Sequence, residues 1–286
     1  MKIIESIEAM KNRSRQVREE RQTIGFVPTM GCLHEGHLSL VRRSIETCDF
    51  TVVSIFINPT QFGENEDLDT YPQSLEEDRK QLQAFEVDAL FLPTRERMYP
   101  EGFKTFTTVE DITTRLCGKS RPSFFRSVTT IVLKLINIVQ PHQAFFGEKD
   151  RQQLEVIRTL VRDLNLDIEI LGLPIVRESD GLAMSSRNLY LSDKERQSAR
   201  SLCKSLETAK TMVETGELST QKIKQEMQKI ILQEPNTRID YISFCDLATF
   251  ADRNSINGTT LIALAVHVGN SRLIDNCIVE TTRCKD

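Results

Sequence analysis

Hydrophobic positions change their spacing repeatedly along the first two thirds of the chain. Runs rich in β-branched and aromatic residues predict strands over residues 23–27, 51–57, 89–92, 105–109, 144–146 and 168–173. Between these runs, apolar residues three or four positions apart predict helices over residues 36–48, 74–85, 127–139 and 149–164. We expect the second of these helices to begin with a capping box formed by Ser74 and Glu77.

This alternation of strands and helices predicts βαβ units with parallel strands and right-handed crossovers. Ligands of such sheets bind at the carboxyl ends of the strands. The loops that follow strands are therefore the expected place for chemistry, and they are residues 28–35, 58–65, 147–150 and 174–188.

The pattern changes after residue 191. Ser192 and Glu195 predict a second capping box at the start of a long charged helix, and residues 220–233 predict another helix. Three β-like runs follow at residues 240–244, 260–268 and 276–280. The fold class expected is therefore α/β, with a Rossmann-like doubly wound parallel sheet over residues 1–176 and a smaller α+β domain over residues 177–286.

Composition narrows the possible partners and location. The 286 residues include 37 basic and 41 acidic ones, which gives a net charge of −4 and argues against nucleic acid as a partner. No apolar stretch approaches the roughly 20 residues that a membrane-spanning helix needs. The odd number of cysteines, scattered without a CxxC pair, predicts reduced thiols in a cytoplasmic protein; they are Cys32, Cys48, Cys117, Cys203, Cys245, Cys277 and Cys284.

Two of the four histidines, His34 and His37, lie three residues apart in the stretch VPTMGCLHEGHLSLV, residues 27–41. If a helix begins near Gly36, both imidazoles lie on one side of its first turn, where backbone N–H groups also favour an anion. This spacing predicts a phosphate site. Histidine pairs also bind metal ions, but no third ligand of the usual type is nearby.

A second candidate stretch is FFGEKDRQQ, residues 145–153. Lys149 falls at a strand-to-helix turn, where its ammonium group would neutralise phosphate, and Gly147 would permit the bend. An ordinary helix start explains Glu148 and Asp150, which complement the helix dipole, but it does not explain Lys149.

Two further loops carry polar side chains of the right kind. In DGLAMSSRN, residues 180–188, two hydroxyls and Arg187 form a donor set for phosphate oxygens, although a polar interdomain linker is an equal alternative. In FINPTQFG, residues 56–63, Asn58 and Gln61 would orient a small polar substrate, and a simple turn at Asn58-Pro59 is again an equal alternative.

Together, VPTMGxLHEGHLSLV, SIFINPTQF with NEDLDTYP, FFGEKDxQQL and VRESDGLAMSSRN closely resemble the pantoate–β-alanine ligases, also called pantothenate synthetases. The resemblance runs in the family's order from about residue 23 to residue 191 and resumes in AVHVGNSRLIDN, residues 265–276. HxGH and MSSR are also similar to the HIGH and KMSKS signatures of a wider nucleotidyltransferase superfamily.

The resemblance implies an ATP-dependent condensation of pantoate with β-alanine through pantoyl adenylate, with release of pyrophosphate and AMP. It implies a homodimer, and Mg²⁺ that arrives with the nucleotide rather than in a protein metal site. His34, His37, Lys149 and Arg187 would be catalytic, with His37 as proton donor, while Gln61 and Gln153 would bind pantoate and Gln61 would also lie near β-alanine. The ATP site implied by the family comprises Met30, Gly31, Cys32, Leu33, His34, Glu35, Gly36, His37, Gly147, Glu148, Lys149, Asp150, Val176, Met184, Ser185, Ser186 and Arg187.

Some positions depart from the family pattern. Where RPGHFRGVATVV is usual, this chain has RPSFFRSVTTIV, so that Ser123, Phe124, Ser127 and Thr129 replace Gly, His, Gly and Ala, and Arg151 replaces a tyrosine. We expect intact chemistry with an altered affinity for pantoate. Two alternatives stay open: a nucleotidyltransferase that makes a dinucleotide, and a nucleotide-binding regulatory protein without turnover.

Overall fold

The computed structural model describes residues 1–64 and 66–281. Asn65, at the end of one expected loop, and Cys284, one of the expected thiols, lie outside the described residues. The chain forms two compact units. Unit 1 comprises Met1–Glu110, Arg121–Glu148 and Gln153–Ile175, and unit 2 comprises Asp111–Ser120, Lys149–Gln152 and the chain from Val176 onward.

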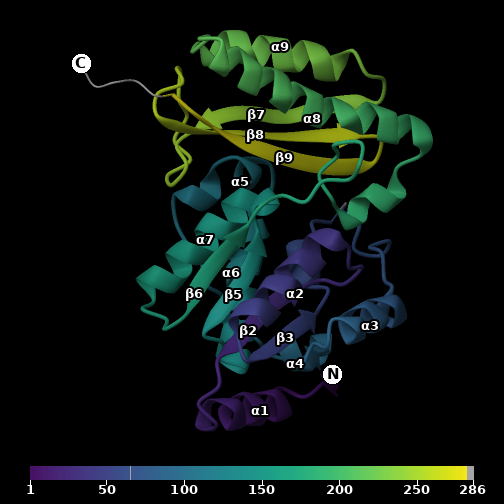
Figure 1. Cartoon of the computed structure of the whole chain (residues 1–286), viewed down its shortest axis with the longest axis vertical. Helices are drawn as coiled ribbons and strands as arrows, with labels where there is room; N and C mark the ends of the chain where they lie inside the picture. The colour runs from purple at the N-terminus through teal and green to yellow at the C-terminus, as the bar shows by residue number, and fades with distance from the viewer. Residues whose placement is uncertain (65, 282–286) are drawn as a thin grey trace. The chain divides into compact units, whose positions relative to one another are not determined.

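Unit 1 contains a parallel sheet, four strands of which, β2, β3, β5 and β6, carry labels in Figure 1. Within the described residues it has six strands in the order β1-β4-β3-β2-β5-β6. Every neighbouring pair is parallel. The bounds are β1 Lys2–Ile4, β2 Ile24–Thr29, β3 Phe50–Ile55, β4 Ala89–Phe91, β5 Gln143–Gly147 and β6 Glu169–Leu173.

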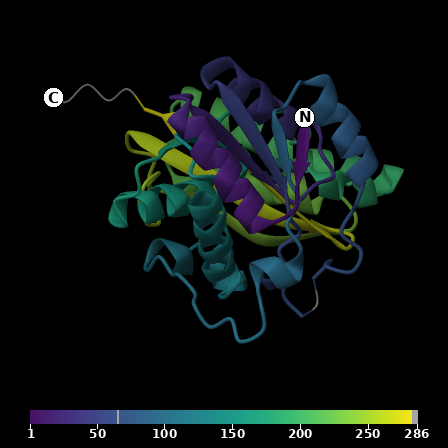
Figure 2. The ribbon, with the colours of Figure 1, turned by 90° about the horizontal axis from the view of Figure 1, so that it is seen from below.

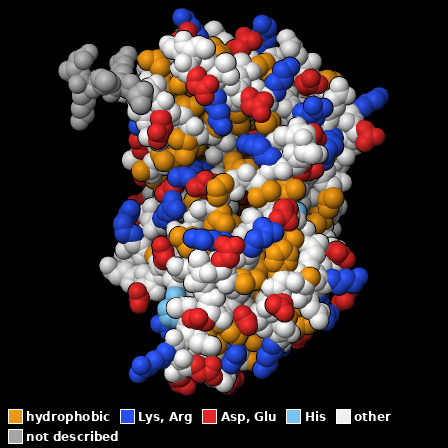
Figure 3. Space-filling model, in the orientation of Figure 1, with side chains coloured by type: hydrophobic (Ala, Val, Ile, Leu, Met, Phe, Trp, Pro, Cys, Tyr) orange, Lys and Arg blue, Asp and Glu red, His pale blue; other side chains and the backbone are white. Residues whose placement is uncertain are grey.

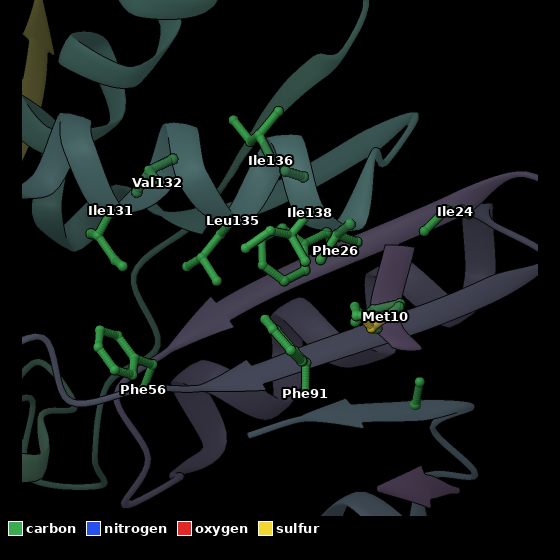
Figure 4. Close-up of a cluster of buried hydrophobic side chains, with 14 of the residues drawn as sticks. Met10, Ile24, Phe26, Phe56, Phe91, Ile131, Val132, Leu135, Ile136 and Ile138 are labelled. Carbon is green, nitrogen blue, oxygen red and sulfur yellow. The ribbon is translucent and has the colours of Figure 1, made fainter. Parts of the chain in front are cut away.

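Helices cover both faces of this sheet (Figures 1 and 2). They are α1 Ile7–Glu19, α2 Glu35–Thr47, α3 Leu75–Ala84, α4 Arg95–Met98, α6 Phe124–Val139 and α7 Arg151–Asp163, together with the short turns η1 Pro59–Gln61 and η3 Glu148–Asp150. Side chains alternate between the faces of a strand, and β2 follows this rule. Phe26 joins a core cluster with residues of α1 and α6, whereas Val27 joins a cluster with residues of α2. Figure 4 shows the side chains of α6 and of the strands facing one another in the first cluster.

Helix α2 lies close against β2 because of a glycine in the strand. A Cβ atom at Gly25 would overlap the Ser44 hydroxyl and would also meet Cys48, both near the end of α2. Any larger residue at position 25 would move the helix that begins with the HxGH stretch. The glycine therefore helps to set where the start of α2 lies relative to the carboxyl end of β2.

Unit 2 contains an antiparallel sheet with helices on one face. Its strands are β7 Thr237–Cys245, β8 Thr259–Val268 and β9 Ser271–Glu280, in the order β7-β8-β9. Helices α8 Asp193–Glu214 and α9 Thr220–Leu232 pack on it (Figure 1). Ser192 and Glu195 form the predicted capping box of α8. The unit also contains η2 Ile112–Thr114, α5 Cys117–Ser120 and η4 Ser186–Tyr190.

Two local predictions were wrong. Residues 105–109 form no strand among the described residues; instead Thr107 N–H donates to Thr130 Oγ1 at 3.0 Å and Thr107 C=O accepts from Thr129 Oγ1 at 2.7 Å. These threonines of α6 thus bind backbone groups that a neighbouring strand would have paired. The Ser74 side chain makes no capping bond with the described backbone and donates to Asp78 Oδ1 at 3.0 Å instead. Strand β1 and helix α1 were not anticipated.

The surface carries charges of both signs. Lys and Arg side chains are interspersed with Asp and Glu side chains over the face drawn in Figure 3. Among the described residues, no helix combines the length and apolar character needed to cross a membrane. No disulfide joins the cysteines of this part of the chain, which are Cys32, Cys48, Cys117, Cys203, Cys245 and Cys277.

Candidate active site

The two histidines of the HxGH stretch stack at the start of α2. Strand β2 ends at Thr29 and α2 begins at Glu35, with His34 as the N-cap. His34 Nδ1 accepts the Gly36 N–H at 3.1 Å, and the His34 and His37 rings lie 4.0 Å apart at an interplanar angle of 30°. The prediction that both imidazoles share one side of the first turn is confirmed. The arrangement places ring nitrogens beside the positive end of a helix, which suits an anion.

The loop before these histidines bends tightly, and a buried carboxylate binds its backbone. Gly31 and Cys32 have φ angles of +84° and +51°. The carboxylate of Asp78 accepts the N–H groups of Cys32 and Leu33, each at 2.8 Å. Asp78 is 1% exposed. Sequence reasoning missed this residue because Asp78 lies 46 and 45 residues from the two amides that it binds, so that no local pattern joins them.

The turn that carries Gln61 follows β3. Asn58 is buried: its Oδ1 accepts from Tyr99 Oη at 2.9 Å and from Thr60 Oγ1 at 3.0 Å, and its amide donates to Ser127 C=O at 3.4 Å. These bonds favour the turn interpretation for Asn58. The Gln61 side chain is half-buried in η1.

Among the residues that depart from the family pattern, Ser127 bonds directly to this turn, and Phe124 contacts Arg121, which also bonds to it. Ser127 Oγ donates to Thr60 C=O at 2.5 Å, and Arg121 Nη2 donates to Gln61 C=O at 2.9 Å. The Arg121 guanidinium lies 3.9 Å from the centroid of the Phe124 ring and forms a bidentate pair with Glu66. Position 127 thus bonds to the backbone beside Gln61 through a hydroxyl that the usual glycine would lack.

Lys149 lies in η3, between β5 and α7, as the strand-to-helix interpretation predicted. Its carbonyl accepts from Asn276 Nδ2 of β9 at 3.0 Å. The neighbouring Gln152 donates to the carbonyls of Ile112 and Arg115 at 2.8 and 2.7 Å and is buried. The bend does not require glycine at position 147. The φ angle of Gly147 is not in the positive range that favours glycine, and an added Cβ would meet no described atom within 4 Å. Asn276 was missed because it lies 127 residues from Lys149.

The MSSR stretch is part of a folded loop in unit 2. Met184 N–H donates to Val176 C=O at 3.0 Å, and Ser185 caps η4 by accepting from Arg187 N–H at 3.3 Å. At the base of the loop, Arg177 forms a bidentate pair with Asp275 at 2.7 and 3.0 Å. This hydrogen bond raises the pKa of the Arg177 guanidinium. The loop is therefore an ordered part of unit 2, with its serines and Arg187 on a fixed turn.

The side chain of Asn188 forms hydrogen bonds at the carboxyl end of the same loop. Its amide donates to Glu178 Oε1 at 2.6 Å and to Ala183 C=O at 3.1 Å. Arg196 of α8 also pairs with Glu178 and Asp180. The sequence-predicted residues are therefore divided between the units: unit 1 holds His34, His37, Gln61 and Gln153, and unit 2 holds Lys149, Val176 and Met184 to Arg187.

The available donors suit phosphate groups better than a metal ion. Imidazole, ammonium, guanidinium and hydroxyl groups donate to anionic oxygens. Within the described part of the chain, no group of three or more His, Cys, Asp or Glu side chains could hold a metal.

Comparison with known proteins identifies the family. The pantoate-beta-alanine ligase family model matches residues 2–278. The pantothenate synthetase of Caldicellulosiruptor bescii is 54% identical over 280 residues, which cover 98% of this chain and 99% of that protein. That of Thermotoga petrophila is 53% identical over 279 residues, covering 98% of this chain and 100% of the relative.

Solved structures agree with the sequence relatives. Pantothenate synthetase from Thermus thermophilus superposes with a TM-score of 0.92 at 40% identity, over 97% of this chain and 99% of that one. Pantoate-beta-alanine ligase from Francisella tularensis, complexed with beta-gamma ATP and beta-alanine, gives a TM-score of 0.82 at 33% identity, over 97% of each chain. The predicted fold class and the resemblance carried by the motifs are both confirmed. The chain belongs to the pantoate–β-alanine ligase family.

Proposed function

We propose that the chain condenses pantoate with β-alanine at the expense of ATP in two steps. A pantoate carboxylate oxygen attacks the α-phosphorus of ATP, the bond to the bridging oxygen breaks, and pyrophosphate leaves. The β-alanine amine then attacks the acyl carbon of pantoyl adenylate, the bond to AMP breaks, and the amine loses a proton. Membership of the family carries this proposal, and the stacked imidazoles at the start of α2 support it.

The residues act by positioning and by stabilising charge. Negative charge spreads over phosphate oxygens during adenylyl transfer, so fixed donors near them lower the barrier. In the proposal, His34, His37, Lys149 and Arg187 face the triphosphate, and His37 delivers a proton to the leaving pyrophosphate. Ser185 and Ser186 add hydroxyl donors, while Gln61 and Gln153 hold pantoate. The remaining ATP contacts are the other members of the family-implied set given above.

Mg²⁺ is proposed to enter with ATP. The candidate phosphate-binding side chains are nitrogen and hydroxyl donors, which fit the phosphate oxygens, and magnesium commonly keeps waters and phosphate ligands. When bound, the ion would neutralise phosphate charge. We also propose a homodimer in the cytoplasm. Sedimentation equilibrium would test the dimer, since a single monomeric mass at working concentration would contradict it.

The deciding experiment measures pyrophosphate and AMP release from ATP with pantoate, with and without β-alanine. We expect a limited release of pyrophosphate with pantoate alone and sustained release of both products when β-alanine is added. Binding of ATP without either product would favour the regulatory protein. Pyrophosphate release that needs a second nucleotide in place of β-alanine would favour the dinucleotide-forming alternative.

A pair of histidine variants tests the site within the same assay. His37→Gln is expected to lower kcat by roughly a hundredfold or more, because a general acid and a phosphate donor are lost together. His267→Gln is the control, since His267 is a half-buried histidine of β8 outside the proposed site. Equal activity of the two variants would contradict the role given to His37.

A further inference from the structure

A buried carboxylate holds the backbone that leads into the stacked histidines. Asp78 lies on the first turn of α3, 46 and 45 residues from the two amides that it binds. One oxygen accepts the Cys32 N–H, and the other accepts the Leu33 N–H and the Ser74 hydroxyl. Both oxygens are therefore engaged by groups that fix the carboxylate and the loop together.

The same contact explains the glycine of the loop. Gly31 has a φ angle of +84°, and an added Cβ would lie 3.1 Å from Asp78 Oδ2 and 3.0 Å from Ile55 Cγ2. A side chain at position 31 would strain the backbone and push the loop away from the carboxylate. Gly31, Cys32 and Leu33 thus form a segment shaped around Asp78, and His34 follows directly.

Backbone N–H groups that point at a carboxylate are not available to a nucleotide. The amides of Cys32 and Leu33 precede the helix start, where loop amides often cradle phosphate. Here Asp78 occupies both of them. Recognition of an anion at this helix start is therefore left mainly to the imidazoles, because the N–H groups of Gly36 and His37 already donate to His34 Nδ1 and to the His34 carbonyl.

We propose that Asp78 is a positioning residue for ATP: it fixes residues 31–33 so that His34 and His37 are presented at the start of α2, and it withdraws two loop amides from phosphate binding. This inference rests on the proposed function for the identity of the substrate. The geometry that carries it, a buried carboxylate bound to consecutive loop amides, is independent of that function.

The test is Asp78→Asn, which keeps the shape of the side chain but replaces one acceptor oxygen with an N–H donor. We expect the KM for ATP to rise roughly tenfold or more and kcat to fall, because small displacements of reacting groups have large effects. The KM for pantoate should stay within about twofold, since Gln61 and Gln153 lie on other segments. The imidazole NMR signals of His34 and His37 should shift without any substrate present.

Asp88→Asn is a matched control. Asp88 accepts the Thr51 N–H at 2.8 Å, so the change again removes a carboxylate that holds a backbone amide of unit 1, but near the amino end of β3. We expect this variant to leave both KM values and the His34 and His37 signals unchanged. Parallel effects of the two variants on stability alone would overturn the proposal.

A milder variant covers the case in which Asp78→Asn does not fold. Ser74→Ala removes one bond to Asp78 and no described capping bond of α3. It should raise the KM for ATP a few-fold and shift the same imidazole signals in the same direction. Unchanged signals would overturn the inference even if the unmodified chain were inactive, whereas shifted signals in an inactive chain would count only against the proposed function.

Discussion

The two candidate phosphate-binding segments are held in place by different interactions. In unit 1, the loop before His34 is fixed through its own backbone, because Asp78 accepts two consecutive N–H groups. In unit 2, the loop that carries Ser185 and Arg187 is fixed by backbone bonds within the loop, such as that from Met184 N–H to Val176 C=O, and by side chains at its base, where Arg177 pairs with Asp275. The Asp78 carboxylate thus fixes the main chain at two consecutive residues, Cys32 and Leu33, whereas the Arg177–Asp275 ion pair anchors one end of a loop.

This difference indicates where each segment is vulnerable. A backbone held by a carboxylate tolerates changes in its own side chains, apart from Gly31, but depends on one distant residue. The loop of unit 2 depends on Arg177, because loss of Arg177 would leave the Asp275 carboxylate charged and buried. The following variants separate the two cases.

The largest effect is expected from Arg177→Met. The Asp275 side chain is 1% exposed, so removal of its partner leaves an uncompensated charge. We expect a loss of about 3–5 kcal/mol in the free energy of unfolding of unit 2, measured by urea denaturation. Lys222→Met is the control because its pair with Glu217 is 70% and 27% exposed, and it should cost about 1 kcal/mol or less. A similar loss of unfolding free energy in both variants would show that the Arg177–Asp275 pair does not hold the loop.

Thiol labelling should report on the two loops separately. Cys32 lies within the Asp78-bound loop, and Cys203 Sγ would lie 3.2 Å from a Cβ added at Gly181. We expect Asp78→Asn to speed the labelling of Cys32 but not of Cys203, and Asn188→Ala to do the reverse. Peptide mass spectrometry measures the labelling of both cysteines in one sample. Faster labelling of both thiols in either variant would show that the two loops open together rather than independently.

Labelling of Cys203 should also depend steeply on pH. Burial raises the pKa of the Cys203 thiol to about 11, although Arg177 opposes this shift. Only the thiolate reacts, so about one thiol in a thousand is reactive at pH 8 and the rate rises about tenfold per pH unit below pH 10. A rate that levels off near pH 9 would contradict the raised pKa.

A smaller effect on function is expected from loss of the Asn276 side-chain amide, which donates to the Lys149 carbonyl. Asn276→Ala removes the bond to the Lys149 carbonyl, which is worth about 1 kcal/mol. The KM for ATP should rise several-fold while the KM for pantoate stays constant. An unchanged KM for ATP would mean that η3 holds Lys149 without help from β9.

The smallest effect concerns the turn that carries Gln61, which is held by a hydroxyl rather than by a carboxylate or an ion pair. Ser127→Ala removes the bond to Thr60 C=O, and Ser123→Ala is the control because Ser123 makes no capping bond with the described residues. We expect only Ser127→Ala to change the KM for pantoate, by about two- to fivefold. Equal values for both variants would remove Ser127 as a source of altered affinity.

Local features of the site could be read from the sequence, and distant ones could not. The pairing of His34 with His37 follows from helical spacing, and the position of Lys149 follows from a strand that gives way to a helix. Asp78 lies 46 residues from Cys32, and Asp275 lies 98 residues from Arg177, so nothing in the local pattern joins them. Residues 105–109 look like a strand by composition, yet the hydroxyls of α6 bind Thr107 on both sides.

The N-cap at His34 also determines which form of the ring is present. Because Nδ1 accepts the Gly36 N–H, a proton on Nδ1 would break the cap, and the neutral ring carries its hydrogen on Nε2. Two charged rings stacked 4.0 Å apart would repel each other at the positive end of a helix. The neutral His34 ring therefore presents an Nε2–H donor, and under the proposed function the proton for the leaving group would come from His37.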